Sequence, residues 1–201
     1  MMKKSKRSDV DPFIVMDVME SARIAEEKGK DIIHMEVGQP GTPAPKIAKD
    51  YITNEINKNN LGYTVSLGLP ALRAKISKLY GDWYNLDLNP NRIVVTTGSS
   101  GAFILSFSAL FDSGDRVGIG SPSYPSYRQI LKSLSLETVD IQTKLQNRFQ
   151  PVPEDITNNN LNGILVASPA NPTGSMLDKQ SRENLINTAN ETNVSFISDE
   201  I

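Results

Sequence analysis

The sequence predicts a three-layer α/β fold in which a mainly parallel sheet is covered by helices on both faces. Short apolar runs at residues 93–97, 116–120, 163–167 and 194–198 are typical of strands, and segments with helical spacing lie between them. Strands that alternate with helices favour parallel pairing, because each helix returns the chain to the same end of the sheet. The polar loops that follow the strands are therefore expected at the carboxyl edge, where open α/β sheets bind ligands.

The N-terminal part of the chain contributes helices joined by loops. Apolar spacing predicts an amphipathic helix at residues 12–29, and residues 32–37 read as a short extended segment. Further helices are expected at residues 45–58 and from Pro70, a residue that suits the first helical turn, to Tyr84. Residues 1–8 are polar and basic, and we expect them to be disordered.

From residue 92 onward, strands and helices alternate. The turn Gly98-Ser99-Ser100-Gly101 leads into residues 102–111, which are apolar nearly all round and predict a buried helix. The chain ends directly after a strand, which would leave a sheet edge bare, so we expect an incomplete chain. The remaining predicted elements are helices near residues 127–133 and 178–190, a strand at 136–141, and one short helical piece within the polar stretch 142–162.

Composition limits the class of protein. The 201 residues are 38% hydrophobic and 22% charged, which is typical of a globular protein with a sizeable core. The net charge of −2 predicts no nucleic-acid partner, and no apolar run approaches the roughly 20 residues that span a membrane. The sequence has no cysteine, which excludes disulfides and Cys-ligated metals and is compatible with a reducing cytoplasm, the location that we expect. We expect no metal site.

A phosphate could bind where residues 98–101 precede the buried helix. Unpaired backbone N–H groups and the helix dipole attract anions there, and Ser99 and Ser100 add hydroxyl donors. The alternative is that this segment is a plain helix N-cap, because serine is a favoured cap residue.

Three further loop residues follow predicted strands. Tyr124, held between Pro122 and Pro125, offers a stacking surface, although it could equally be a packed core tyrosine. Asn171 has little conformational freedom between two prolines and offers an amide donor, although the loop could simply turn the chain. Asp199 ends an apolar strand, so its carboxylate needs a partner, either a cationic ring nitrogen or a nearby arginine. A planar cofactor with a phosphate, a phenolic oxygen and a ring nitrogen would use all four loops, and pyridoxal 5′-phosphate has those features.

Several motifs occur together in a recognisable order. They are Gly-Gln-Pro at residues 38–40, Tyr-Thr-x3-Gly-Leu-x2-Leu-Arg at 63–73, Ser-Pro-Ser-Tyr-Pro at 121–125, Asn-Pro-Thr-Gly at 171–174 and Ser-Asp-Glu-Ile at 198–201. With this set the chain, from about Asp11 to its end, resembles the fold-type I, pyridoxal-phosphate-dependent class I/II aminotransferases of the aspartate and aromatic branch. The resemblance implies an N-terminal arm with part of a small domain at residues 1–44 and a cofactor-binding large domain at residues 45–201.

The resemblance also implies a role for each matching residue. Gly98, Ser99 and Ser100 would hold the cofactor phosphate, and Tyr124 would stack on the pyridine ring. Asn171 would donate to the phenolic oxygen, and Asp199 would pair with the protonated ring nitrogen. Gly38 would lie against the substrate carboxylate. Tyr63 would reach the phosphate of the neighbouring subunit, which predicts a homodimer for the full-length protein.

One departure concerns the family's catalytic lysine, which forms a Schiff base with the cofactor in a Ser-x-x-Lys setting. No Ser-x-x-Lys occurs in this sequence, so we expect the lysine beyond residue 201 and no activity from the chain alone. The implied reaction is amino-group transfer between an amino acid and a 2-oxo acid. A lyase or decarboxylase with the same cofactor site, or a non-catalytic binding module, remains an alternative.

Four smaller expectations follow. The resemblance predicts cis peptide bonds at Ser121-Pro122 and Asn171-Pro172. It also predicts that residues 93–97 lack their sheet neighbour, and that residues 194–198 expose an unpaired edge. Helical spacing predicts that Arg23, Arg73 and Arg128 lie on solvated faces.

Overall fold

The computed structural model describes residues 3–200, which fall into two compact units. The first unit contains the residues up to Phe13 together with those from Thr97 onward, and the second unit runs from Ile14 to Thr96. None of the helices in the described part of the chain is long and apolar enough to cross a bilayer.

The unit from Ile14 to Thr96 consists of helices and loops. Helix α1 spans Ile14–Glu27, α2 spans Lys46–Ile56, and α3 spans Pro70–Tyr84, the range that the sequence predicts. Pro70 begins α3 because its missing N–H and fixed φ suit the first helical turn. Residues 32–37 form no strand.

Arg73 corrects the expectation of a solvated face. Its side chain is buried and donates hydrogen bonds to the carbonyl oxygens of Gly68 (3.2 Å) and Pro90 (3.0 Å) and to Asn91 Oδ1 (3.4 Å). Helical spacing could not reveal this, since the acceptors lie outside α3: Gly68 is in the loop before it, and Pro90 and Asn91 are in the 3-10 helix η2 (Pro90–Arg92) after it.

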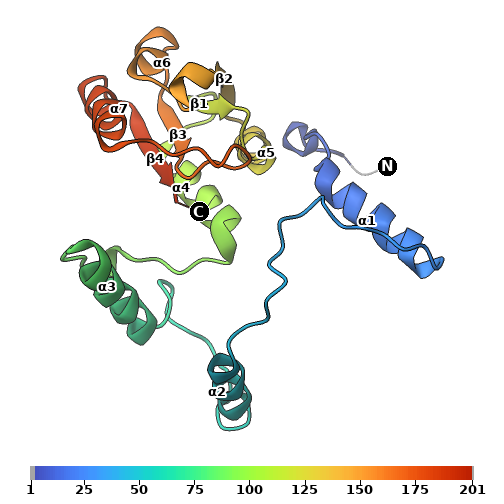
Figure 1. Cartoon of the computed structure of the whole chain (residues 1–201). Helices are drawn as coiled ribbons and strands as arrows, with labels where there is room; N and C mark the ends of the chain where they lie inside the picture. Colours follow the sequence, from blue (N-terminus) through green and yellow to red (C-terminus); the bar gives the residue numbers. More distant parts are fainter. Residues whose placement is uncertain (1–2, 201) are drawn as a thin grey trace. The chain divides into compact units, whose positions relative to one another are not determined.

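The unit that begins at Thr97 contains a four-stranded, fully parallel sheet in the order β2-β1-β3-β4 (Figure 1). The α/β class and parallel pairing that the sequence predicts are confirmed. Among the described residues β4 pairs only with β3, as expected for an edge. The elements are 3-10 helix η1 (Lys6–Ser8), α4 (Gly98–Leu110), β1 (Arg116–Ser121), α5 (Pro125–Ser133), β2 (Glu137–Gln142), η3 (Leu145–Asn147), α6 (Pro153–Asn158), β3 (Gly163–Ala167), α7 (Lys179–Glu191) and β4 (Ser195–Asp199).

Helices cover both faces of this sheet, which gives three layers. On one face, side chains of α4 and α5 pack against Val117, Ile119 and Leu165 in a single buried cluster. On the other face, side chains of α6 and α7 pack against Ile164 and Val166. The alternation of residues 164, 165 and 166 between the two clusters follows from the two-residue period of a strand. Both faces are buried, which explains why β3 reads as a continuous apolar run.

Glycine at position 118 allows close packing on the face covered by α6 and α7. A Cβ atom at this position would lie 2.7 Å from Leu161 Cδ1 and 2.9 Å from Ile141 Cδ1, both closer than real Cβ contacts. Leu161 and Ile141 belong to the buried cluster of that face, so a larger residue at position 118 would force these two side chains to shift within the core.

Two predictions about the start of this region are wrong. Residues 93–97 form no strand; Val95 N instead donates to the Leu67 carbonyl (3.0 Å), so the segment is held by a loop rather than by a sheet. Residues 98–101 are not a turn before the helix but its first turn, because α4 begins at Gly98. The disorder expected at residues 1–8 is also wrong at Lys6–Ser8, which form η1.

Candidate functional site

The candidate site lies at the carboxyl ends of β1 and β3. From β1 the chain continues through α5 to β2 on one side, and from β3 it continues through α7 to β4 on the other. The loops after two adjacent strands therefore diverge, which is the switch point where open α/β sheets bind ligands. A pocket at this point is lined by residues of both loops, including Pro122, Ser123, Ala170 and Asn171, and by Tyr127.

Tyr127 is the centre of the cluster beside this pocket. It is almost fully buried on α5, and its hydroxyl donates a hydrogen bond to Asp199 Oδ2. Burial and, second, the hydrogen bond to the Asp199 carboxylate raise the pKa of Tyr127 far above its usual value. Asp199 therefore has a phenol as its partner within the described residues, rather than the arginine that the sequence left open. Since a carboxylate has two oxygens, it can accept from Tyr127 and from a further N–H group.

The ring of Tyr124 is held from two sides by other aromatic rings. Its centroid lies 5.9 Å from that of Phe13 and 5.5 Å from that of Tyr127, both in edge-to-face arrangements. The two residues before Phe13 are hydrogen-bonded to α5. Gln129 Nε2 of this helix donates to the carbonyl oxygens of Asp11 (3.2 Å) and Pro12 (3.4 Å). Tyr124 is half-buried, so the packed and the stacking interpretations of this residue are compatible.

The N-terminus of α4 joins the cluster through Phe103. This ring lies 5.2 Å from that of Tyr127, and Phe103 follows Ser99 by one helical turn. The N-cap residue Thr97 makes no side-chain cap hydrogen bond. Ser99 and Ser100 are exposed positions of the first turn, and within residues 3–200 their hydroxyls make no hydrogen bond. They are therefore not the plain N-cap that the sequence left as an alternative.

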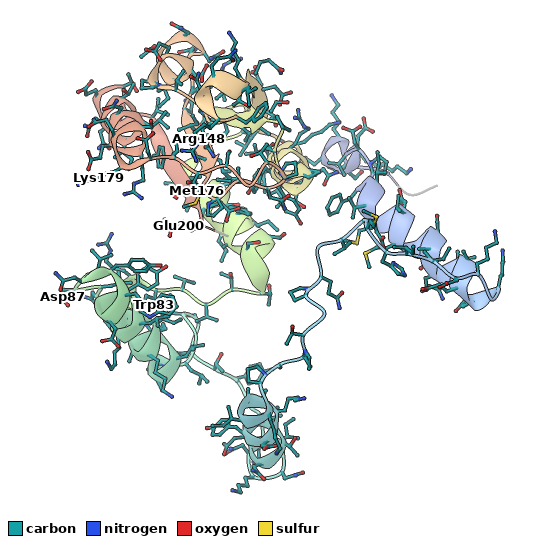
Figure 2. All side chains as sticks on the ribbon, in the orientation of Figure 1. Trp83, Asp87, Arg148, Met176, Lys179 and Glu200 are labelled. Atoms are coloured by element: carbon teal, nitrogen blue, oxygen red, sulfur yellow. The ribbon has the colours of Figure 1, made fainter. Side chains whose placement is uncertain are left out.

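Asn171 lies in the loop between β3 and α7 and lines the pocket. It is exposed, and no side chain or backbone group among the described residues bonds to its amide. The peptide bonds Ser121-Pro122 and Asn171-Pro172 are cis, as predicted, and Ser168-Pro169 is also cis. Figure 2 labels two neighbours in sequence of these residues, Met176 beyond the Asn171 loop and Glu200 directly after Asp199.

Gly38 and Tyr63 belong to the other unit and are described with it. Both are exposed, and the Tyr63 ring is fully accessible. Their predicted roles stay predictions.

Within the first unit, the predicted residues are connected through a residue that the sequence did not single out. Tyr127 contacts Tyr124 and Asp199 directly and lines one pocket with Asn171. Its ring also contacts Phe103 of α4, one helical turn after Ser99. Gln150 was also missed, because it lies in a polar stretch with no motif. A buried tyrosine at helical spacing gives no signal of its own; only its position three residues after Tyr124 could have suggested a shared face.

These groups match the chemistry of pyridoxal phosphate. The first turn of α4, where Thr97 makes no side-chain cap hydrogen bond, and the two serine hydroxyls suit a phosphate. The fixed Tyr124 ring suits stacking, the unbonded amide of Asn171 suits a phenolic oxygen, and Asp199 suits a protonated ring nitrogen. The residues present therefore fit this cofactor.

Comparison with known proteins identifies relatives over almost the whole chain. The valine–pyruvate aminotransferase of Mycobacterium tuberculosis is 40% identical over 197 residues, which cover 97% of this chain and 51% of that protein. The aspartate aminotransferase of Thermotoga maritima is 33% identical and matches 92% of this chain and 50% of that protein. The chain thus spans about half the length of the relatives that it matches.

Solved structures agree with this result. A crystal structure of an aminotransferase from Mycobacterium tuberculosis matches with a TM-score of 0.95 and 38% identity, over 100% of this chain and 52% of that one. A candidate aminotransferase from Silicibacter pomeroyi matches with a TM-score of 0.89 and 58% identity, over 100% of this chain and 51% of that one. The family model for aminotransferase class I and II matches residues 30–201. The chain therefore belongs to the aminotransferase class I and II family.

Proposed function

We propose that this chain is the N-terminal, cofactor-holding half of a pyridoxal-phosphate-dependent aminotransferase. Its reaction moves an amino group between an amino acid and a 2-oxo acid. Members of the family use pyridoxal phosphate. The observation that carries the proposal is that one buried residue, Tyr127, contacts Tyr124, Asp199 and Phe103 of α4 and lines a pocket with Asn171.

Each residue has a proposed task in holding the cofactor. The first turn of α4, with Gly98, Ser99 and Ser100, binds the phosphate, because the helix dipole and the hydroxyls favour a dianion there. Tyr124 stacks on the ring. Asn171 donates its amide N–H to the phenolic oxygen and so stabilises the deprotonated oxygen.

Asp199 has the central chemical task. Its carboxylate keeps a proton on the ring nitrogen, because an opposite charge within hydrogen-bond distance favours the charged form. Pyridoxal phosphate, when bound, supplies an electron sink for the pair left at the substrate Cα. Tyr127 holds the Asp199 carboxylate in place through its hydroxyl.

Residues of the second unit have proposed tasks toward substrate and partner. We propose that Gly38 lies against the substrate carboxylate through its backbone. We also propose that the exposed Tyr63 reaches the cofactor phosphate of a second subunit in a homodimer. The substrates are an amino acid and a 2-oxo acid of unspecified side chain, and the cytoplasmic location stays a prediction.

The test uses the full-length protein that contains this chain, loaded with pyridoxal phosphate. We expect transfer from some amino acid in a panel to pyruvate or 2-oxoglutarate, with loss of at least about 100-fold in rate for Asp199→Ala. Release of CO₂ or of an eliminated group, without formation of a new amino acid, would identify the lyase or decarboxylase instead. The 201-residue chain alone should give no adduct at a single lysine that borohydride traps.

A further inference from the structure

Gln150 is a buried polar residue that the proposed chemistry does not use. The residue is 4% exposed, and it precedes α6 in the stretch between β2 and β3. Burial of an amide is unfavourable unless its N–H groups find acceptors. The hydrogen-bond partners of Gln150 therefore indicate its structural role.

The side-chain amide of Gln150 joins the two ends of the loop that carries Asn171. Its Nε2 donates to the carbonyl oxygen of Ala167, the last residue of β3, at 3.1 Å. The same nitrogen lies 3.1 Å from the carbonyl oxygen and 3.1 Å from the hydroxyl of Ser175, beyond the loop. Two N–H groups are thus shared among three oxygens. Figure 2 shows Arg148 and Met176, close neighbours of Gln150 and Ser175 in sequence, on these two segments.

The loop also has internal hydrogen bonds, which require its two ends to lie close together. Ala170 N donates to the Ser175 carbonyl (2.8 Å) and Gly174 N to the Ala170 carbonyl (2.7 Å). The carbonyl oxygen of Ser175 therefore accepts both a hydrogen bond from within the loop and one from Gln150. Gln150 also lines the same pocket as Asn171.

We propose that Gln150 is a positioning residue that fixes the Asn171 loop, residues 168–175, and so the place of the Asn171 amide. The consequence for the cofactor rests on the function proposed above. Gln150 touches neither cofactor nor substrate in this proposal; it acts by holding Ala167 and Ser175 at a set separation.

The first test needs no cofactor. Hydrogen exchange of the Ala170 and Gly174 amides is measured in the full-length protein and in Gln150→Met, which keeps length and apolar packing but removes the donor. We expect about 10- to 100-fold faster exchange at these two amides, the range that corresponds to losing a buried hydrogen bond. Amides of β1 should change little. Gln150→Leu, which is apolar and also lacks the donor, serves if Gln150→Met folds poorly, and the exposed Gln146→Met is the matched control.

The second test reads the cofactor itself. Loss of the Asn171 donor should shift the pH midpoint of the visible absorbance of bound pyridoxal phosphate, because the phenolic oxygen loses a hydrogen bond that favours its charged form. Gln150→Met should shift this midpoint in the same direction as Asn171→Ala but less, and the double variant should match Asn171→Ala alone.

The outcomes separate the two proposals. Unchanged exchange at Ala170 and Gly174 in both Gln150 variants would overturn the positioning role. Faster exchange in a protein that binds no pyridoxal phosphate would leave the positioning of the loop standing and refute the proposed function. A midpoint shift in Gln150→Met that simply adds to that of Asn171→Ala would show that Gln150 does not act through Asn171.

Discussion

The phenol of Tyr127 and the carboxylate of Asp199 form a hydrogen bond that joins α5 to the end of β4 across 72 residues of sequence. The bond places a buried donor beside the carboxylate that the proposed chemistry needs. Because this hydrogen bond helps to raise the pKa of Tyr127, titration of that phenol reports whether the contact is formed.

Tyr127 should ionise only at very high pH in the folded protein. Its pKa is raised by burial and, to a smaller extent, by the hydrogen bond to Asp199. A folded pKa above the unfolded value of about 10 means that the stability from this group is full below pH 10 and falls as the pH rises further.

Spectrophotometric titration of tyrosine measures this directly. We expect one tyrosine to ionise only as the protein unfolds, and we expect Asp199→Asn to lower its apparent pKa because the negative charge is gone. The Tyr127→Phe variant should remove that late step and no other. Simultaneous ionisation of all tyrosines in the folded protein would contradict the contact.

Gly118→Ala should destabilise the sheet. The new Cβ would press on Leu161 and Ile141, which are buried and cannot withdraw freely, so we expect a loss of about 1–3 kcal/mol. Gly120→Ala, on the same strand and face, is the matched control, because its Cβ would meet Thr143 Cγ2 only at 3.4 Å. Urea unfolding compares the two; equal losses would show that packing at Gly118 is not limiting.

Arg73→Met should loosen the loops around α3. The substitution leaves the Gly68 and Pro90 carbonyls without a buried donor, at a cost of about 1–3 kcal/mol. Limited proteolysis near these loops should become faster. Lys75→Met, an exposed position on the same helix, should leave the cleavage rate unchanged. An equal rate in both variants would mean that Arg73 does not hold the loops.

His34 should make the stability of the second unit fall at alkaline pH. Hydrogen bonds to Glu36 (2.6 Å) and Glu26 (2.9 Å) raise the pKa of His34 to about 9. The stabilisation is therefore full below about pH 6.5 and is lost as the pH rises through about 9. Denaturant midpoints from pH 6 to 10 should show this loss in the wild type. His34→Gln should show a flatter profile, and identical profiles would refute the pairing.

The 201-residue chain by itself should associate. Ile104 (46% exposed), Leu105 (58%) and Leu110 (49%) leave apolar side chains of α4 accessible, and exposed apolar surface promotes association. Light scattering of the purified chain should rise with concentration, and Leu105→Gln should reduce it. Cooperative unfolding of a monomer at all concentrations would contradict this expectation.

Local pattern in the sequence was enough to predict the sheet strands from Arg116 onward. It is clearest at β3, where both faces are buried and the apolar run is uninterrupted. The strand prediction was wrong at residues 93–97, where a similar apolar run hydrogen-bonds to a loop instead of to another strand. A strand is defined by what it pairs with, which a single segment does not encode.

The site was predictable where motifs mark it and not elsewhere. Asn171 and Tyr124 stand out because prolines fix their loops. Tyr127 and Gln150 are visible only once distant segments meet, since their bonds reach Asp199 and Ser175. Buried polar contacts of this type depend on the tertiary structure, and neither residue has a periodic or compositional signature.

The pairing of β3 with both of its neighbours has a further consequence. Gly163, Ile164 and Leu165 lie opposite Val117, Gly118 and Ile119 on one side and opposite Ser195, Phe196 and Ile197 on the other. A slip of one residue would advance everything downstream by about 3.3 Å and would turn Leu165 toward α6 and α7. The register of β3 therefore fixes the position of the loop that follows it. Aliphatic packing in the core thus determines where the side-chain amide of Asn171 lies.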